Sequence, residues 1–577
     1  MSRRRRRDAA ARRSEPRRPA RRAPSAVAGH QLHRALARLV QQRPLLVAAA
    51  LVTLHVVLAL ITFQPQPHTG GDNAAYITLA TSLIETGTYT ELWDPAQPPH
   101  TKYPPVFPAV LAIALAVGLK PFVQLKLVVL AFSAAAVAFS FLWIRGRRRP
   151  AMALAAGLLL AVSPGVLREG RWILSDVPFW CFTMIALWAF ERFRGDWRRF
   201  TIGVAAVLLA YFTRTAGLPL AVAALAWLGW RGYWRHFVVM ALVIGVPALL
   251  WWLRGRAFGP AGYASEFWLL DPYRPDLGNI RVTDLLDRML ENQGKYVRIH
   301  LPILFGGMAA PLLVLLSALT FLFALGGWIV RVLRPVRLRI ADVFVPLYLG
   351  LILVWPAVWS GERFLLPVLP LLLFYAGDAL HRLTRRVATR LDVVAGAAAA
   401  LLIFVLMLPG LAEATQRGRE CTRLYRAGDR YPCIGGAYWQ DFFAMAEWSR
   451  TGLAGDAVVL SRKPRLFHVL SGQRSAIFPL TTDTNAFFDL AERTSARFVV
   501  FDGVDAASQM YLLPAITSRP AAFCVVHVVP PSGTTLLGIV DGDSANAPGP
   551  QAGAAPDLSD CGPGFPQVVA ASPRSGP

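Results

Sequence analysis

Residues 121–150 read PFVQLKLVVLAFSAAAVAFSFLWIRGRRRP, an apolar run over 121–144 that ends in a cluster of arginines. An apolar run of roughly 17–25 residues is long enough to cross a bilayer as a helix. A basic cluster directly after such a run is typical of a cytoplasmic loop. This stretch therefore predicts a membrane-spanning helix whose C-terminal end lies in the cytoplasm.

Apolar runs followed by short basic loops recur along the 577 residues. The chain is 55% hydrophobic and only 16% charged, whereas soluble proteins carry about 25% charged residues. The pattern predicts an α-helical polytopic membrane protein with about eleven spans. The expected spans lie near 45–63, 121–144, 151–165, 178–192, 200–212, 216–230, 237–253, 303–330, 341–358, 364–380 and 393–409.

The basic loops set the orientation. They begin near residues 145, 191, 231, 331 and 381, and all fall on the cytoplasmic side if the N-terminus is inside. The segment 104–119 is apolar, but a full span there would invert every later loop. We therefore expect it to be a re-entrant or juxtamembrane helix of an outer loop over 64–120. A twelfth span is the alternative.

The net charge of +25 does not indicate a nucleic-acid partner, because its distribution follows the loops and one tail. Residues 1–43 are rich in Arg and predict a disordered cytoplasmic tail rather than a secretory signal peptide. The remaining positive charge lies between apolar runs. The sequence has no phosphate-binding G-x-x-x-x-G-K-[ST] motif and no strand-linked G-x-G-x-x-G, so a nucleotide site is not expected.

The membrane domain is expected over 44–409, and the chain changes character after it. Residues 410–540 contain a helical pattern in YWQDFFAMAEWSRTGL and PRLFHVLSG, and short strands in DAVVLS, ARFVVFD, FCVVHVV and TTLLGIV. This pattern predicts a small periplasmic α/β domain. Four of the five cysteines lie after residue 410, and Cys421–Cys433 is the simplest disulfide to expect. Residues 541–577 are expected to be a disordered tail.

The first outer loop begins with HTGGDNAAYITLATSLIETGTY, residues 68–89. Its apolar positions recur at i, i+3, i+4, i+7 and i+8, which predicts an amphipathic helix that ends at Gly87 and lies flat on the membrane. Asp72 stands at the start of this helix. It is either an N-cap or an acid with a chemical role.

Other charged residues gather at the outer ends of the expected spans. They are Lys102, Arg168, Arg171, Asp176, Arg214 and Arg363. Charges at membrane depth usually face a cavity or a partner. Each arginine has an alternative as an anchor to lipid headgroups, and Asp176 has one as a helix cap. Together they offer cations for a phosphate and carboxylates that can act as a base toward a hydroxyl.

The order of motifs GDNAAY, TKYPPVFPAVLA, REGRWILSDVPFW, TRTAG and GERFLLPVLPLLLFYAG resembles the GT-C membrane glycosyltransferases over roughly residues 45–410. The nearest branch is that of the bacterial lipid A aminoarabinose and Rgt-type galacturonosyl transferases, with protein O-mannosyltransferases more distant. The resemblance implies a polyprenyl-phosphate sugar donor and a site on the outer face of the bacterial inner membrane.

The resemblance also implies roles. Asp72 matches the first-loop acid that acts as base, and Asp176 falls where a second acid lies. Lys102 and Arg363 match the cations that contact lipid phosphate; Arg168, Arg171 and Arg214 are further candidates. Asn73 and Thr101 replace acids of the family, which leaves a divalent metal in doubt. His68 and His100 flank the loop but are expected to be surface residues.

The expected reaction is inverting sugar transfer to a lipid A, glycan or protein acceptor in the cell envelope. The apolar groove between the spans and helix 104–119 is expected to hold the polyprenyl chain. A lipid-linked sugar flippase is the alternative from another class, although it predicts internal repeats and charges at mid-membrane. A third interpretation is an inactive scaffold or sensor with the same fold.

Overall fold

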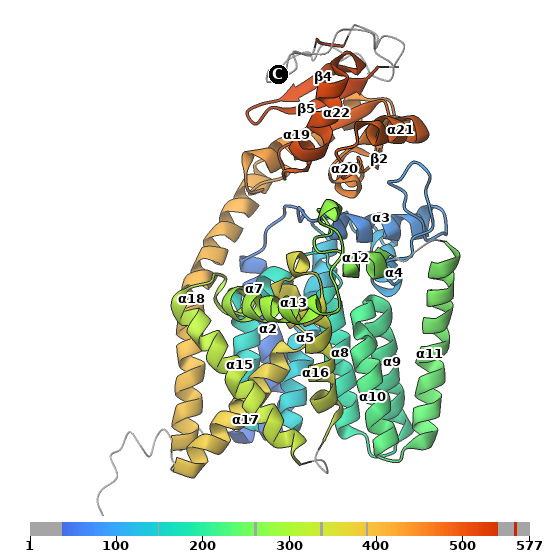
Figure 1. Ribbon diagram of the computed structural model, residues 1–577. Coiled ribbons are helices and arrows are strands. Elements are labelled where there is room, and N and C mark those ends of the chain that lie inside the picture. The colour runs from blue at the N-terminus through green and yellow to red at the C-terminus, as the bar shows by residue number, and fades with distance from the viewer. Residues whose placement is uncertain are drawn as a thin grey trace, which may run out of the picture.

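The computed structural model describes residues 37–147, 149–258, 262–334, 338–387, 391–540 and 559–561. The chain forms a bundle of helices with a smaller α/β domain beyond one end (Figure 1). We call this end of the bundle the domain end and the opposite one the loop end. The tail expected over 1–43 lies outside the described residues up to 36. Residues 37–42 are helical rather than disordered, and Arg145 donates a hydrogen bond to the carbonyl of the buried Val40.

The bundle consists of helices that run roughly along its length (Figure 1). They are α2 (Pro44–Ile61), α5 (Leu125–Gly146), α6 (Pro150–Val162), α8 (Asp176–Arg192), α9 (Trp197–Thr213), α10 (Leu218–Trp230), α11 (Trp234–Ala257), α15 (Pro311–Val332), α16 (Ile340–Val354), α17 (Leu369–Val387) and α18 (Leu391–Arg426). Within the described ranges, five helices are long and apolar enough to cross a membrane: α2, α5, α11, α15 and the part of α18 from Gly396. The chain is therefore a membrane protein.

The span expected over 303–330 is present but begins later, at Pro311. The structure has a short helix α14 (Leu301–Gly306), a break at Gly307, and then α15. Gly307 has φ +79°, a left-handed conformation that ends a helix and favours glycine. Pro311 then opens α15, where the missing amide costs no hydrogen bond. The apolar composition of the run conceals this break.

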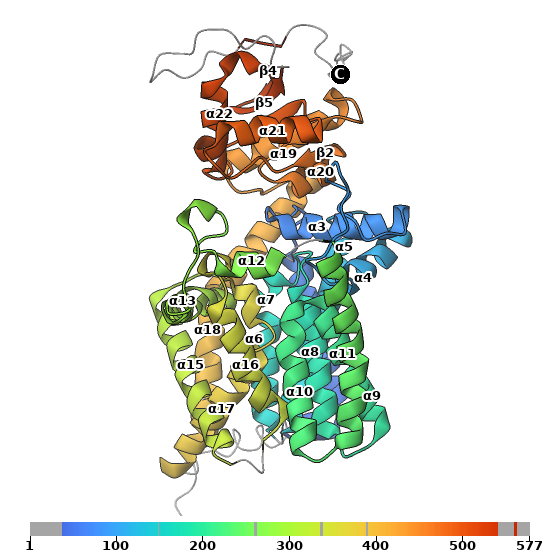
Figure 2. The same ribbon diagram turned by 45° about the vertical axis from the view of Figure 1, so that its right-hand side comes forward.

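Short helices lie across the domain end, between the bundle and the α/β domain (Figure 2). They include α3 (Gly71–Glu85), α4 (Val106–Ala116), α7 (Pro164–Glu169), α12 (Gly262–Trp268) and α13 (Asp284–Lys295). Helix α4 has 11 residues, which gives it a length of about 16 Å, half of a hydrocarbon core of about 30 Å. A helix of this length is too short to cross the bilayer by itself, and its place in an outer loop stays a prediction.

The amphipathic helix expected to lie flat on the membrane is present as α3, but other parts of the protein cover it. All residues from Asn73 to Ala80 are buried. Helix α4 packs on one side of α3, and α20 of the α/β domain packs on another. The apolar periodicity identified the helix, but it carries no information about a second partner that covers the polar face.

The α/β domain contains the strands and helices that the sequence predicts. Its sheet has the order β2-β1-β3-β5-β4, with β1 (Val458–Leu460), β2 (Arg474–Ala476) and β3 (Phe498–Phe501) parallel, and β4 (Phe523–Val529) and β5 (Thr534–Ile539) an antiparallel hairpin. Helices α19 (Ala437–Gly452), α20 (Pro464–Ser471), α21 (Thr484–Thr494) and α22 (Leu513–Ser518) complete the domain. The sequence analysis did not include β2, α21 and α22.

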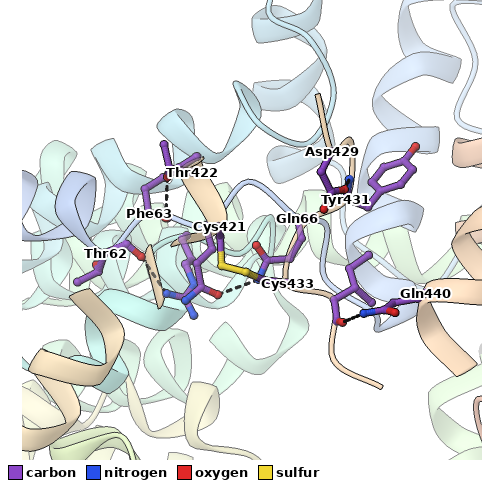
Figure 3. Close-up of a disulfide and its surroundings, with 12 residues drawn as sticks. Thr62, Phe63, Gln66, Cys421, Thr422, Asp429, Tyr431, Cys433 and Gln440 are labelled. Atoms are coloured by element: carbon purple, nitrogen blue, oxygen red, sulfur yellow. Dashed lines mark hydrogen bonds between the residues drawn. A yellow bond between two sulfur atoms is a disulfide. The ribbon is translucent and has the colours of Figure 1, made fainter. Parts of the chain in front are cut away.

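Two disulfides tie the chain at this end. Cys421–Cys433 is present, as expected, and lies beside Thr62 and Phe63, which follow α2 (Figure 3). The hydroxyl of Thr422 donates to the carbonyl of Phe63 at 3.4 Å. Cys524–Cys561 joins β4 to residues 559–561, and Asp560 pairs with Val525. This short segment is ordered although it lies within the tail expected to be disordered; the rest of 541–577 lies outside the described residues.

Candidate active site

A cavity of about 1000 Å³ lies between the domain end of the bundle and the α/β domain. Its walls come from α3, α10, α12, α16 and the segment that leads into α20. The charged side chains that line it are Asp72, Lys102, Arg214, Glu266, Arg363, Arg462, Lys463 and Arg465. Segments separated by several hundred residues thus place charges around one space.

Asp72 is the second residue of α3 and does not cap it. The N-cap is Gly70, which has no side chain with which to cap the helix. Both terminal nitrogens of Arg363 lie 3.2 Å from Asp72 Oδ2, and the Tyr103 hydroxyl donates to Oδ1 at 2.8 Å. The side chain keeps 36% exposure because it faces the cavity. The capping interpretation is therefore wrong.

Gly70, two residues before Asp72, has no room for a side chain. The amide of Gly70 donates to Nδ1 of His68 at 2.9 Å, so the His68 ring lies directly against the backbone. A Cβ on Gly70 would lie 2.7 Å from that ring. Glycine at 70 therefore lets His68 pack against the start of α3, where Asp72 faces the cavity.

The surroundings of Asp72 act on its pKa in opposite directions. Burial by itself raises the pKa of this carboxyl, whereas Arg363, the Tyr103 hydroxyl and Arg465 lower it. The sum of the lowering effects is larger, so the pKa of Asp72 lies well below its usual range. In the free protein this group is a carboxylate, and its ion pair with Arg363 makes it a weak base.

Asp176 lies deeper than Asp72. It is the first residue of α8, after the N-cap Ser175, and is 2% exposed. Its Oδ2 lies 2.8 Å from Arg214 and 4.0 Å from Arg363. Asp176 does not line the cavity; it holds two of the cations that do. Arg363 thus stands between two carboxylates.

Lys102 is paired with a residue that the sequence analysis missed. Its Nζ lies 2.6 and 2.8 Å from the two carboxylate oxygens of Glu266 in α12. It also lies 4.9 Å from the centre of the Tyr263 ring and 5.5 Å from that of Trp359. Glu266 lies in an expected outer loop with several aromatic residues. This position is the one feature of the sequence that could have marked it as a candidate site residue.

Arg168 and Arg171 do not line the cavity. Arg168 binds Glu362 and lies 3.3 Å from Glu169. Arg171 donates to the carbonyl of Thr62 at 3.2 Å. Their place as direct phosphate ligands is therefore not supported by the geometry. Both tie loops of the domain end together, and Arg168 holds the residue next to Arg363.

The α/β domain supplies three cations that the sequence analysis did not select. Arg462, Lys463 and Arg465 belong to SRKPRL, which leads into α20. Arg465 lies 3.4 Å from Glu91, and its guanidinium lies over the rings of Trp93 at 5.3 Å and Tyr103 at 5.8 Å. Three cations lie within four residues, in a domain expected on the same side of the membrane as Asp72. This clustering could have identified them as candidate site residues.

His100 is not the surface residue that was expected, and His68 and His100 do not form a metal site. His100 is 2% exposed; its Nε2 accepts from the Tyr103 amide at 2.6 Å, so Nδ1 donates to Glu91 at 2.6 Å. Among the described residues, no group of three or more His, Cys, Asp or Glu side chains could hold a metal ion. Since Asp72 and Asp176 both bind guanidinium groups, the arrangement does not fit a divalent cation.

The lower part of the cavity is apolar. Leu218, Val222 and Leu347 line it and are exposed, so the cavity reaches the lipid-facing surface between α10 and α16. Residues 106–116 of α4 do not line it. Of the segment 104–119, Pro104 lines the cavity, and the exposed apolar side chains belong to α10 and α16.

No family model matches the sequence, and no curated protein matches it. Solved structures do. ArnT from Cupriavidus metallidurans, in the apo state and bound to undecaprenyl phosphate, superposes with TM-scores of 0.53 and 0.52 at 14% identity, over 87% of this chain and 99% of that one. The oligosaccharyltransferase AglB from Archaeoglobus fulgidus gives a TM-score of 0.49 at 12% identity over 87% and 75% of the two chains. The chain therefore has the fold of the GT-C membrane glycosyltransferases.

Proposed function

We propose that this chain transfers a sugar from a polyprenyl-phosphate donor to a hydroxyl of a lipid, glycan or protein acceptor. The domain end then faces the periplasm, and the bundle lies in the bacterial inner membrane. The observation that carries the proposal is the convergence of Asp72, Lys102 and Arg363 on one cavity that is open to lipid. The structure of ArnT bound to undecaprenyl phosphate supports a lipid phosphate donor for a chain of this fold.

The donor enters between α10 and α16, with its polyprenyl chain along Leu218, Val222 and Leu347. Its phosphate binds the cations above them, Arg214, Arg363 and Lys102. These groups stabilise the charge that grows on the phosphate oxygen as the bond to the anomeric carbon breaks. The product that leaves is polyprenyl phosphate.

The same phosphate activates the base. When Arg363 binds the donor, its attraction for Asp72 weakens, and the carboxylate becomes more basic. Asp72 then takes the proton of the acceptor hydroxyl while its oxygen attacks the anomeric carbon from the side opposite the phosphate. A single displacement of this kind inverts the configuration of the sugar.

The test uses Asp72→Asn. The amide cannot take a proton, but it still accepts the hydrogen bond from Tyr103, so the fold is retained. We expect transfer to fall by roughly 10²-fold or more, the usual scale for the loss of a general base. The readout is mass spectrometry of envelope glycans in a deletion strain that carries each variant, followed by transfer assays on purified protein.

Asp94→Asn is the matched control, since Asp94 lies in the same outer loop and does not line the cavity. Its carboxylate accepts a hydrogen bond from the amide of Ala96, which an asparagine side chain can also accept. This variant should restore the glycan pattern in full. Near wild-type transfer by Asp72→Asn would move the role of base to another residue. An unchanged glycan pattern in the deletion strain would contradict the proposed transfer itself.

A further inference from the structure

The cations of the cavity lie on two opposite walls. Arg214, Arg363 and Lys102 belong to the bundle and its outer loops, next to the apolar opening between α10 and α16. Arg462, Lys463 and Arg465 belong to the α/β domain, together with the apolar side chains of Ile477 and Leu480. A single donor phosphate at the opening leaves the second wall without a ligand.

On the bundle wall each cation has a close carboxylate. Arg363 pairs with Asp72 at 3.2 Å, Arg214 with Asp176 at 2.8 Å, and Lys102 with Glu266 at 2.6 Å. These pairs are compact and specific to each cation.

The domain wall is less well neutralised. Arg462 takes Asp505 at 2.8 Å, which leaves Lys463 with the same carboxylate at 3.9 Å. Arg465 has Glu91 at 3.4 Å, but that acid already binds His100 at 2.6 Å. Within the described part of the chain, no ion pair shorter than 3.9 Å is recorded for Lys463, although its side chain is only 20% exposed.

A partly buried ammonium without a close carboxylate is costly unless a ligand supplies the missing charge. We propose that Lys463 and Arg465 bind an anionic group, a phosphate or a carboxylate, on the acceptor, so that the acceptor of this enzyme is an anion. This proposal rests on the proposed function, because it needs a second substrate opposite the donor.

An anion bound at this wall would position the acceptor close to Asp72. Arg465 lies over Tyr103, whose hydroxyl binds Asp72. An acceptor held by Arg465 and Lys463 therefore has its reacting hydroxyl within a short reach of the base. The fixed position lowers the entropy cost of bringing the two substrates together.

The experiment measures binding to the full chain in nanodiscs of neutral phospholipid, with undecaprenyl phosphate present at saturation. The probes are glucose 1-phosphate and neutral glucose. We expect glucose 1-phosphate to bind at least about tenfold more tightly than glucose, which is the scale of one charge-assisted hydrogen bond. Lys463→Gln should remove most of this preference and leave the Kd of undecaprenyl phosphate unchanged.

Lys120→Gln is the matched control, because Lys120 is an exposed lysine of the outer loop over 64–120 and does not line the cavity. It should keep the full preference. A second arm uses dihexanoyl phosphatidic acid below its micelle concentration. Tighter binding of this probe than of glucose 1-phosphate assigns a lipid-borne anion that also contacts Ile477 and Leu480, and equal binding assigns a water-soluble one.

Three results would overturn the anion subsite: equal binding of glucose and glucose 1-phosphate, an unchanged preference in Lys463→Gln, or competition between glucose 1-phosphate and undecaprenyl phosphate. Failure of the wild type to bind undecaprenyl phosphate would instead count against the proposed transfer, and with it against an acceptor at this wall.

Discussion

Asp72 serves two partners in succession in the proposed reaction. In the free protein Arg363 holds its carboxylate 3.2 Å away and lowers its pKa, although burial opposes this effect. A group with a lowered pKa stabilises the fold above the usual pKa range of an aspartate and loses this contribution as acid protonates it. The donor phosphate then competes with Asp72 for Arg363. The ion pair therefore stabilises the free site, and it also keeps Asp72 a weak base until the donor binds.

This competition predicts a difference between two pH profiles. The acid limb of kcat/KM reports the free enzyme, where Asp72 stays ionised down to below about pH 4. The acid limb of kcat reports the complex, where the phosphate has weakened the hold of Arg363. We expect the limb of kcat to lie at higher pH than that of kcat/KM. Coinciding limbs would show that Arg363 stays on Asp72 throughout the reaction.

Glu169 gives a second, independent pH prediction. Burial at the end of α7 raises its pKa to about 7, although Arg168 at 3.3 Å opposes the shift. The folded state therefore binds a proton that the unfolded chain releases above about pH 4.3. Stability falls as pH rises from there to about 7 and remains lower above it. Glu169→Gln should raise Tm by a few degrees at pH 8 and much less at pH 5, by thermal unfolding in one detergent. An equal change at both pH values would contradict the shift.

At the level of single residues, the sequence predicted part of the site. Asp72, Lys102, Arg214 and Arg363 could be selected because each is a charge at the outer end of an apolar run, where it needs a partner. Their pairing could not be predicted, since the contacts join residues hundreds of positions apart. The same rule wrongly included Arg168 and Arg171, because nearness to the bilayer does not say which way a side chain points.

Helices α15 and α17 pack through a glycine. A Cβ on Gly327 would lie 2.2 Å from the carbonyl oxygen of Tyr375, whereas one on its neighbour Gly326 meets nothing within 4 Å. Backbones that approach this closely leave no room for a methyl group, as in many packed membrane helices.

The two neighbours form a matched pair for mutation. Gly327→Ala should destabilise the protein by about 1–3 kcal/mol through overpacking, while Gly326→Ala should be neutral or slightly stabilising because alanine favours a helix. The measurement is Tm and folded yield in the same detergent. Equal behaviour of both variants would mean that α15 and α17 separate easily.

Element types were predicted better than their surroundings. The periodicity of 73–87 located α3, yet Asn73 and Ser82 on its polar face are buried. The sequence pattern indicates that one face of the helix is apolar. It does not indicate that loops and another domain also bury the opposite face. The break at Gly307 was missed for the opposite reason, because uniform apolarity conceals where a run bends.

At the scale of the whole molecule, the two ends of the bundle should lie on opposite sides of the membrane. Residue 145 lies near the end of α5, and residue 415 lies in the second half of α18. Helix α18 leads from the bundle toward the α/β domain (Figure 1). A reporter fused after 145 should read cytoplasm and one after 415 periplasm, by paired alkaline phosphatase and fluorescent-protein fusions. A periplasmic reading at 145 would invert the assignment of the cavity.

The orientation drawn from the repeated basic loops stays a prediction. The α/β domain could be predicted from its alternating pattern. The position of that domain over Asp72 could not. The position of the domain depends on the packing of α20 against α3 and on the length of α18. Neither feature can be predicted from local composition.

Helix α18 runs without interruption through 36 residues from the loop end to the α/β domain. That is about 54 Å of helix, against about 30 Å of hydrocarbon. Height and rotational phase are inseparable in such a stalk: one inserted residue lifts the domain by about 1.5 Å and turns it through about 100°. A single insertion above the membrane would therefore swing Lys463 away from Asp72. If the α/β domain is to keep its orientation toward the bundle, its distance from the bundle can change only in steps close to whole helical turns.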